Sequence, residues 1–157
     1  MSTTTLRRTA AVATCGLLLA MAPSSAGAAS YRGKTSGGTS IQLSVSGKRV
    51  SGIKTLVPTS CVETTGSFGT AVGAELFQPP GSFTVGRTAK VKALQPAAMN
   101  SGTKATKNYT VTLKSAGKRA ISGKLAVNFS YLRPGPSIYQ SYVFICSGSA
   151  RFTAKAR

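Results

Sequence analysis

Apolar and polar residues alternate over several short stretches of this chain, and this pattern limits most strongly how it can fold. Ile41, Leu43 and Val45 alternate with glutamine and serine residues. Successive side chains of a strand point to opposite faces of a sheet, so the pattern predicts a strand with one buried face. Gly47 and Lys48 follow at once, and glycine accepts the positive φ of a two-residue hairpin turn. The folded part of the chain is therefore expected to begin with a β-hairpin.

The rest of the chain shows the same pattern, with turn signals between the strands. Pro79-Pro80-Gly81 and Pro134-Gly135-Pro136 are breaks of this kind. No stretch after the first 28 residues has helical periodicity. The sequence therefore predicts an all-β fold, a small antiparallel β-sandwich or open barrel of about eight strands. The clearest strands are 41–45, 49–57, 76–78, 82–85, 88–94, 109–114, 121–131, 138–146 and 150–154.

Four details of this prediction depend on single residues or weak patterns. Pro58 is expected to stop the second strand, because proline has no N–H to donate to a neighbouring strand. Residues 62–73 are rich in Gly, Ser and Thr, so they predict only a weak strand or a loop. Residues 95–107 are expected to be the least regular part. Ser147-Gly148 is interpreted as the turn of a last hairpin.

The N-terminus has the three parts of a secretory signal peptide. Arg7 and Arg8 form a charged head, an apolar stretch covers 10–22, and small residues end the segment at 26–28. We expect cleavage near Ala28, so that residues 1–28 are the signal peptide and 29–157 form a single domain. The apolar stretch is shorter than the roughly 20 residues that cross a bilayer, and no later stretch is long enough, so no transmembrane segment is expected in the mature protein. The paired arginines leave twin-arginine export open beside the general route.

Three cysteines are present, and Cys15 lies within the predicted signal peptide. Cys15 also leaves lipidation open, although a lipidated cysteine normally follows the apolar stretch instead of lying within it. Cys61 and Cys146 would remain as a pair in an oxidising compartment, which predicts a disulfide. Two buried thiols are the alternative interpretation.

Charge is the most unusual property of the composition. The chain has 20 Lys and Arg residues and 2 acidic residues, so without Arg7 and Arg8 the mature domain keeps 18 against 2 and a net charge of +16. Such a surface attracts polyanions over about 8 to 10 Å at ordinary salt. Anionic wall polymers, phospholipid surfaces, nucleic acid and acidic proteins are all possible partners on this ground. The alternative is that the charge only keeps a secreted protein in solution.

Two hairpins of the chain resemble each other and carry charged tips. Gly47-Lys48-Arg49 and Gly117-Lys118-Arg119 are each followed by a Ser-Gly pair, with one residue inserted in the second hairpin. The repeat reflects either a duplication or the reuse of one turn chemistry. The tips either meet a partner or protect strand edges against aggregation. The candidate anion-binding residues are Lys48, Arg49, Lys90, Lys92, Lys114, Lys118, Arg119, Lys124 and Arg133.

Several short motifs resemble a largely uncharacterised group of small secreted actinobacterial proteins. They are Tyr31 to Ser36, the strand 41–45, Cys61, and the closing Cys146-Ser147-Gly148 with Arg151 to Ala154. This sequence lacks the tryptophan that such tails often carry. The resemblance implies a signal peptide, a small β-sandwich and one disulfide between its halves. It implies no activity.

The composition argues against an enzyme. The chain has no His and no Asp, which excludes imidazole-based catalysis and His-based metal sites in their usual forms. A glycosidase would need both Glu63 and Glu75, one on each side of a sugar. We interpret each glutamate more simply as a partner of nearby lysines. No catalytic residue, metal or cofactor is therefore expected.

These observations leave two classes of function. The first is a non-enzymatic module, secreted or associated with the cell wall, that holds anionic envelope or extracellular polymers through Lys and Arg and weakens as salt rises. The alternative is an inhibitor or adaptor in a secreted complex that binds a protein partner through the loops 95–107 and 132–137. Nucleic acid is a weaker candidate, because strand tyrosines that could stack bases usually pack in the core. Tyr139 and Tyr142 are out of phase, so at least one of them is expected to be exposed.

Overall fold

The protein folds into nine β-strands with no helix in the described part of the chain. A computed structural model describes residues 27–65, 69–97, 103–117, 119–135, 137 and 140–157. Residues 1–26 of the predicted signal peptide therefore lie outside the described residues, as do Lys118 and Tyr139. The strands are β1 (Ala29–Thr35), β2 (Ser40–Ser46), β3 (Arg49–Glu63), β4 (Thr70–Phe77), β5 (Ser82–Thr84), β6 (Thr88–Pro96), β7 (Lys104–Ser115), β8 (Ala120–Pro134) and β9 (Ser141–Ala156).

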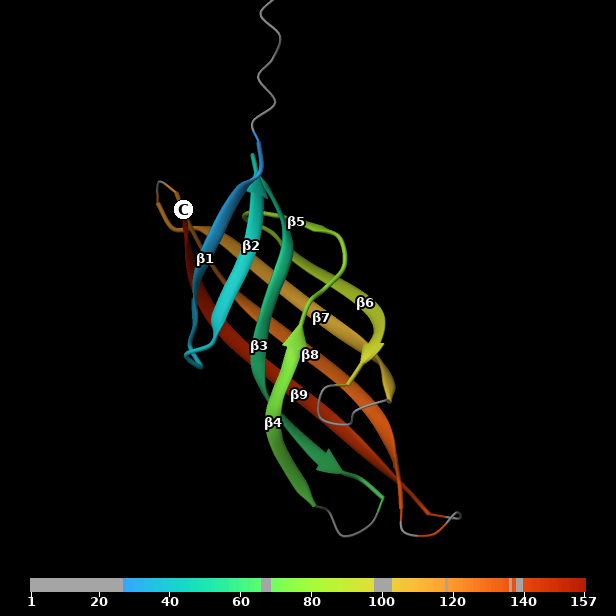
Figure 1. The fold of residues 1–157 in the computed structure, drawn as a ribbon. Helices are drawn as coiled ribbons and strands as arrows, with labels where there is room; N and C mark the ends of the chain where they lie inside the picture. The colour runs from blue at the N-terminus through green and yellow to red at the C-terminus, as the bar shows by residue number, and fades with distance from the viewer. Residues whose placement is uncertain (1–26, 66–68, 98–102, 118, 136, 138–139) are drawn as a thin grey trace, which may run out of the picture.

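The strands form a single antiparallel sheet that folds over into two layers. Their order is β4-β3-β2-β1-β9-β8-β7-β6, with β5 paired to β3 beside this path. In Figure 1, β1 to β4 lie in front and β6 to β9 cross behind them. The described residues of β4 and β6 do not pair with each other, so the sheet is not a closed barrel. The predicted all-β antiparallel class is confirmed.

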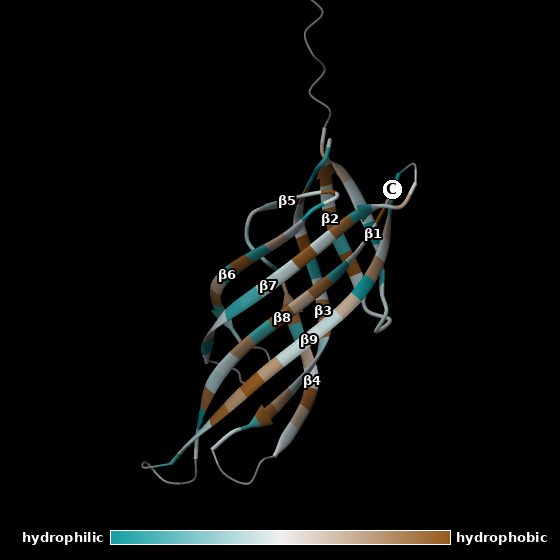
Figure 2. Ribbon diagram, turned by 180° about the vertical axis from the view of Figure 1, so that it is seen from behind, coloured by the Kyte–Doolittle hydropathy of each residue, from teal (hydrophilic) through white to brown (hydrophobic). Residues whose placement is uncertain are grey.

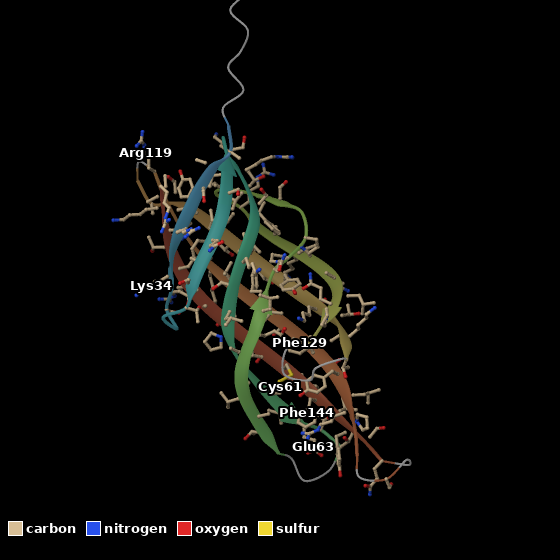
Figure 3. The ribbon with its side chains drawn as sticks, in the orientation of Figure 1. Lys34, Cys61, Glu63, Arg119, Phe129 and Phe144 are labelled. Atoms are coloured by element: carbon tan, nitrogen blue, oxygen red, sulfur yellow. A yellow bond between two sulfur atoms is a disulfide. The ribbon has the colours of Figure 1, made fainter. Side chains whose placement is uncertain are left out.

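The core lies between the two layers and follows the predicted alternation. Ile41 and Leu43 of β2 are buried, as are Leu125 and Val127 of β8. The layers meet through aromatic rings, because Phe77 of β4 packs edge-on against Tyr109 of β7 with ring centroids 5.0 Å apart. Further along, Tyr131 stacks on both Phe129 and Phe144. Figure 3 shows Phe129, Cys61, Phe144 and Glu63 in succession toward one end of the sheet.

Pro58 does not stop β3, contrary to the sequence prediction. The strand continues to Glu63, and Pro58 pairs with Ala74 of β4. On its other side β3 leaves β2 after Lys54 and joins β9 from Thr59 onward. Pro58 thus lies between the part of β3 that pairs with β2 and the part that pairs with β9. Its missing N–H removes no hydrogen bond to either of these strands.

The prediction of a last hairpin with its turn at Ser147-Gly148 is also wrong. β9 is one continuous strand through these residues, paired to β8 from Ser141 to Lys155. The glycine has a different role here, because a Cβ at Gly148 would lie 2.6 Å from the carbonyl oxygen of Pro58. Its missing side chain lets β3 cross close to β9.

Two weakly predicted segments are more regular than expected. Residues 62–73 contain the end of β3 and the start of β4, although 66–68 lie outside the described residues. Within 95–107, β6 continues to Pro96 and β7 begins at Lys104. These polar segments gain their order from the neighbouring strands, a long-range effect that their own composition does not report.

The predicted disulfide is confirmed. Cys61 of β3 and Cys146 of β9 are directly opposite each other in the register and are bonded. Both are fully buried. The bond therefore fixes the place where β3 changes its partner to β9.

We predict that the C61A/C146A variant loses about 4 kcal/mol of its free energy of unfolding. The bond closes a loop with a sequence separation of 85 residues, which restricts the unfolded chain. Guanidinium unfolding of oxidised wild type and variant measures the difference, and wild type kept in reductant should resemble the variant. A loss below about 1 kcal/mol would contradict this role.

Candidate anion-binding surface

Glu75, one of the two acidic residues, is neutralised inside the core. Lys107 of β7 donates a hydrogen bond to Glu75 Oε1 of β4 at 2.5 Å, and both side chains are fully buried. The Lys107 ammonium also donates to the carbonyl of Pro96 and lies 5.7 Å from the centre of the Phe129 ring. The interpretation of Glu75 as a lysine partner is therefore confirmed, and the ion pair joins the two layers.

The hydroxyl of Tyr109 lies close to this pair and donates a hydrogen bond to Gln95 Oε1 at 2.6 Å. Burial raises the pKa of Tyr109 above its usual value, and the negative charge of Glu75 raises it further. The phenol therefore stays neutral at physiological pH and serves as a structural hydrogen-bonding group.

Glu63 is buried at the C-terminal end of β3. Its interpretation as a lysine partner is wrong for the described residues. Its Oε1 has no hydrogen-bond partner among them, and no described cation pairs with it. Glu75 is opposite Val57 in the register, so six residues of β3 separate the two carboxylates along the strand. This corresponds to roughly 20 Å, well beyond the 5–9.5 Å that paired glycosidase carboxylates need.

Burial of both carboxylates leaves the surface almost purely cationic. Every Lys and Arg in the described part of the chain is exposed, except Lys107. No described carboxylate side chain shares that surface with them, because Glu63 and Glu75 are the only acidic residues in the sequence. The cations can therefore be neutralised only by solvent ions or by a partner.

Four cations lie side by side on the outer face of the sheet. Lys124 of β8 is directly opposite Arg151 of β9. Lys114 of β7 is opposite Ser122, two residues from Lys124, and Lys34 of β1 is opposite Thr153, two residues from Arg151. Directly opposite Cβ atoms lie about 4.5–5.5 Å apart and diagonal positions about 7–8 Å apart. We call Lys34, Lys114, Lys124 and Arg151 the cationic row.

A hollow on the sheet lies within the cationic row. It has a volume of about 440 Å3, and its lining includes Lys114, Lys124 and Arg151. The hydroxyls of Thr112, Ser122 and Thr153 complete its polar lining. The hollow therefore offers ammonium, guanidinium and hydroxyl donors together, which is the chemistry that binds phosphate, sulfate or carboxylate groups.

A second set of cations extends the row across β1. Lys155 of β9 is directly opposite Arg32 of β1, and Arg32 is opposite Gln42, which is in turn opposite Lys54 of β3. All three cations are exposed. The positive charge thus continues along the outer side of the folded sheet, from β7 through β9 and β1 to β3 in the other layer.

The charged hairpin tips form a separate site at the end of the sheet. Lys48 and Arg119 line one hollow of about 320 Å3 together with Tyr31, so the two similar hairpins bring their tips together. Arg49 is exposed beside Lys48. Arg119 has a φ of 62°, a backbone conformation that is unusual for a residue other than glycine.

The remaining candidates are exposed but lie apart from the cationic row. Lys90 and Lys92 share one face of β6, as their spacing predicts, and Arg133 lies near the end of β8. Tyr142 is partly buried and packs against the core, and it is opposite Arg133. Which of the two tyrosines is exposed stays open, since Tyr139 lies outside the described residues.

Sequence reasoning missed five cations of this surface as candidate residues: Arg32, Lys34, Lys54, Arg151 and Lys155. A signal for two of them was present, because Arg151, Thr153 and Lys155 alternate with the buried Ala150, Phe152 and Ala154. Their position next to Lys124 depends on the pairing of β8 with β9, which the sequence does not display.

No family model matches this chain, and neither a curated protein nor a solved structure matches it. The described residues include no helix that is long and apolar enough to cross a membrane. They also contain no group of three or more His, Cys, Asp or Glu residues that could hold a metal ion.

We predict that K107M lowers the free energy of unfolding by about 3–5 kcal/mol, because it leaves the Glu75 carboxylate buried without its cation. The double variant E75L/K107M should recover most of this loss, since it removes both charges. Urea unfolding of the two single variants and the double variant gives the coupling free energy. Additive effects would mean that the two charges are independent.

Proposed function

We propose that this protein is a secreted, non-enzymatic binding module that attaches to anionic polymers of the cell envelope or extracellular space. The cationic row is the binding surface, with Arg32, Lys54 and Lys155 extending it. Secretion is supported by the predicted signal peptide and by the Cys61–Cys146 disulfide, since disulfides persist in oxidising compartments.

The observation that carries this proposal is the pairing of like charges on neighbouring strands. Lys124 is directly opposite Arg151, and Lys155 is directly opposite Arg32. Like charges in such positions destabilise a sheet, and no described carboxylate side chain lies on this surface to compensate. A bound polyanion would remove the repulsion, so the arrangement favours the bound state at the expense of the free one.

The hollow gives this surface more than a diffuse positive charge. Arg151 can bind an anionic oxygen pair in a bidentate way, and Lys114 and Lys124 can add single charge-assisted hydrogen bonds. A polymer that carries repeated phosphate, sulfate or carboxylate groups would place one group there and its neighbours along the rest of the face. Its affinity would fall steeply as salt rises, because binding releases counterions.

We predict that K124Q/R151Q raises the Kd for immobilised dextran sulfate or polyphosphate at least about tenfold. A tenfold change corresponds to about 1.4 kcal/mol, within the range of the charge-assisted hydrogen bonds removed. The same variant should unfold no more easily than wild type, because it removes a repulsive pair. Binding at 50 mM and 200 mM salt and guanidinium unfolding measure the two effects.

The matched control is K48Q/R49Q, which removes the same charge from a hairpin tip. Its Kd should change much less than that of K124Q/R151Q, and uncharged dextran should bind neither variant nor wild type. Equal losses in both variants would contradict a defined site. Salt-resistant retention of a single protein from culture fluid would instead favour the inhibitor or adaptor class.

A further inference from the structure

One end of the outer face is apolar, in contrast to the cationic row. Val62 of β3 and Ile145 of β9 are directly opposite each other and are 45% and 56% exposed. Leu132 of β8 is opposite Val143 of β9, and Leu94 of β6 shares with both of them a hollow of about 520 Å3. We call Val62, Leu94, Leu132, Val143 and Ile145 the apolar end. Figure 2 shows brown segments on β8 and β9 in the region away from the C-terminus.

The apolar end departs from the pattern of the rest of β8 and β9. Along most of β8 and β9 the outward side chains are polar, but Val143, Phe144 and Ile145 are consecutive apolar residues, so both faces of β9 are apolar there. Leu94 and Leu132 are 66% and 58% exposed. Contiguous exposed apolar residues of this kind mark surfaces that become covered by a partner.

Charge at the rim limits what that partner can be. Lys104 lines the same hollow as Leu94 and Leu132 and is exposed. Contact with a second copy of the chain would bring this cation toward its equal, and no described carboxylate side chain is exposed to offset the repulsion. The partner therefore needs an apolar region beside negative charge.

The exposed side chains also favour a lipid surface over a protein. The large exposed apolar residues in the described part of the chain are all aliphatic. Strong protein interfaces are centred on Trp, Tyr and Arg in fitted pockets, whereas insertion of aliphatic side chains into lipid needs no matching shape. Anionic headgroups attract nearby Lys and Arg residues at the same time.

We propose that the apolar end docks on the surface of a bilayer that contains anionic phospholipid. Leu94, Leu132 and Ile145 would enter the boundary between headgroups and acyl chains, while Lys104 contacts a phosphate. This proposal does not rest on polymer binding. Ile145 and Arg151 are six residues apart on β9, which places the two surfaces roughly 20 Å apart.

The test is flotation of the full protein with vesicles of phosphatidylglycerol and phosphatidylcholine. L132S should lower the partition coefficient about fivefold or more, because it removes a half-exposed leucine that would enter the lipid. L56S is the matched control, since Leu56 is 44% exposed on β3 and lines a different hollow. It should bind vesicles nearly as wild type does. A guanidinium unfolding transition of L132S close to that of wild type would show that it is folded.

Four results would overturn the proposal. Wild type could fail to float, or it could float equally well with pure phosphatidylcholine, which would remove the role of Lys104. Equal losses in L132S and L56S would remove the role of the apolar end. Sedimentation velocity supplies the fourth, since a wild-type dimer that L132S converts to a monomer would make this end an interface between copies of the chain.

Discussion

Strand β3 changes its neighbour partway along its length, and the arrangement of both layers depends on this change. Up to Lys54 it pairs with β2, and from Thr59 it pairs with β9, where the Cys61–Cys146 bond joins the two strands. The hairpin β1–β2 therefore separates β3 from β9 over only part of the sheet. Where the hairpin is present, β1 lies directly beside β9 and carries its cations to those of β9. Where it is absent, Val62 of β3 comes opposite Ile145 of β9. The same change of partner thus underlies both the cationic and the apolar part of the outer face.

Burial of the acidic residues determines the charge of the protein surface. Glu75 forms its ion pair with Lys107 between the layers, and Glu63 is enclosed near Phe144. The ion pair is expensive to desolvate, but breaking it is more expensive still, so Glu75 and Lys107 stay paired in the interior. The surface is left with cations that repel one another. Repulsion between Lys124 and Arg151 is tolerable in a fold closed by a disulfide and a continuous core, and a polyanion would convert it into attraction.

Local features of the sequence were predictable, and contacts between distant segments were not. The alternation at Ile41 to Val45 and the glycine at position 47 act within a few residues, so the first hairpin follows from them. The turn predicted at Gly148 was wrong for the same reason. From the sequence alone, a glycine that permits a turn cannot be distinguished from one that permits close approach to Pro58. The high positive charge followed from the composition. The choice of Lys114 and Lys124 as candidate residues followed from their spacing in the predicted strands. Their grouping with Arg151 and Lys34 depends on the register between strands far apart in the chain. The signal peptide and the resemblance to secreted actinobacterial proteins stay predictions.

The central claim is that polyanions bind at one defined surface and not wherever the protein is positive. The most direct measurement is an NMR titration of the 15N-labelled protein with a short sulfated oligosaccharide at moderate salt. The account predicts saturable shift changes in the amides of Lys34, Lys114, Lys124 and Arg151, with much smaller changes at Lys48 and Arg49. Shift changes of similar size at all exposed Lys and Arg residues would contradict it, because they would show that net charge alone attracts the ligand.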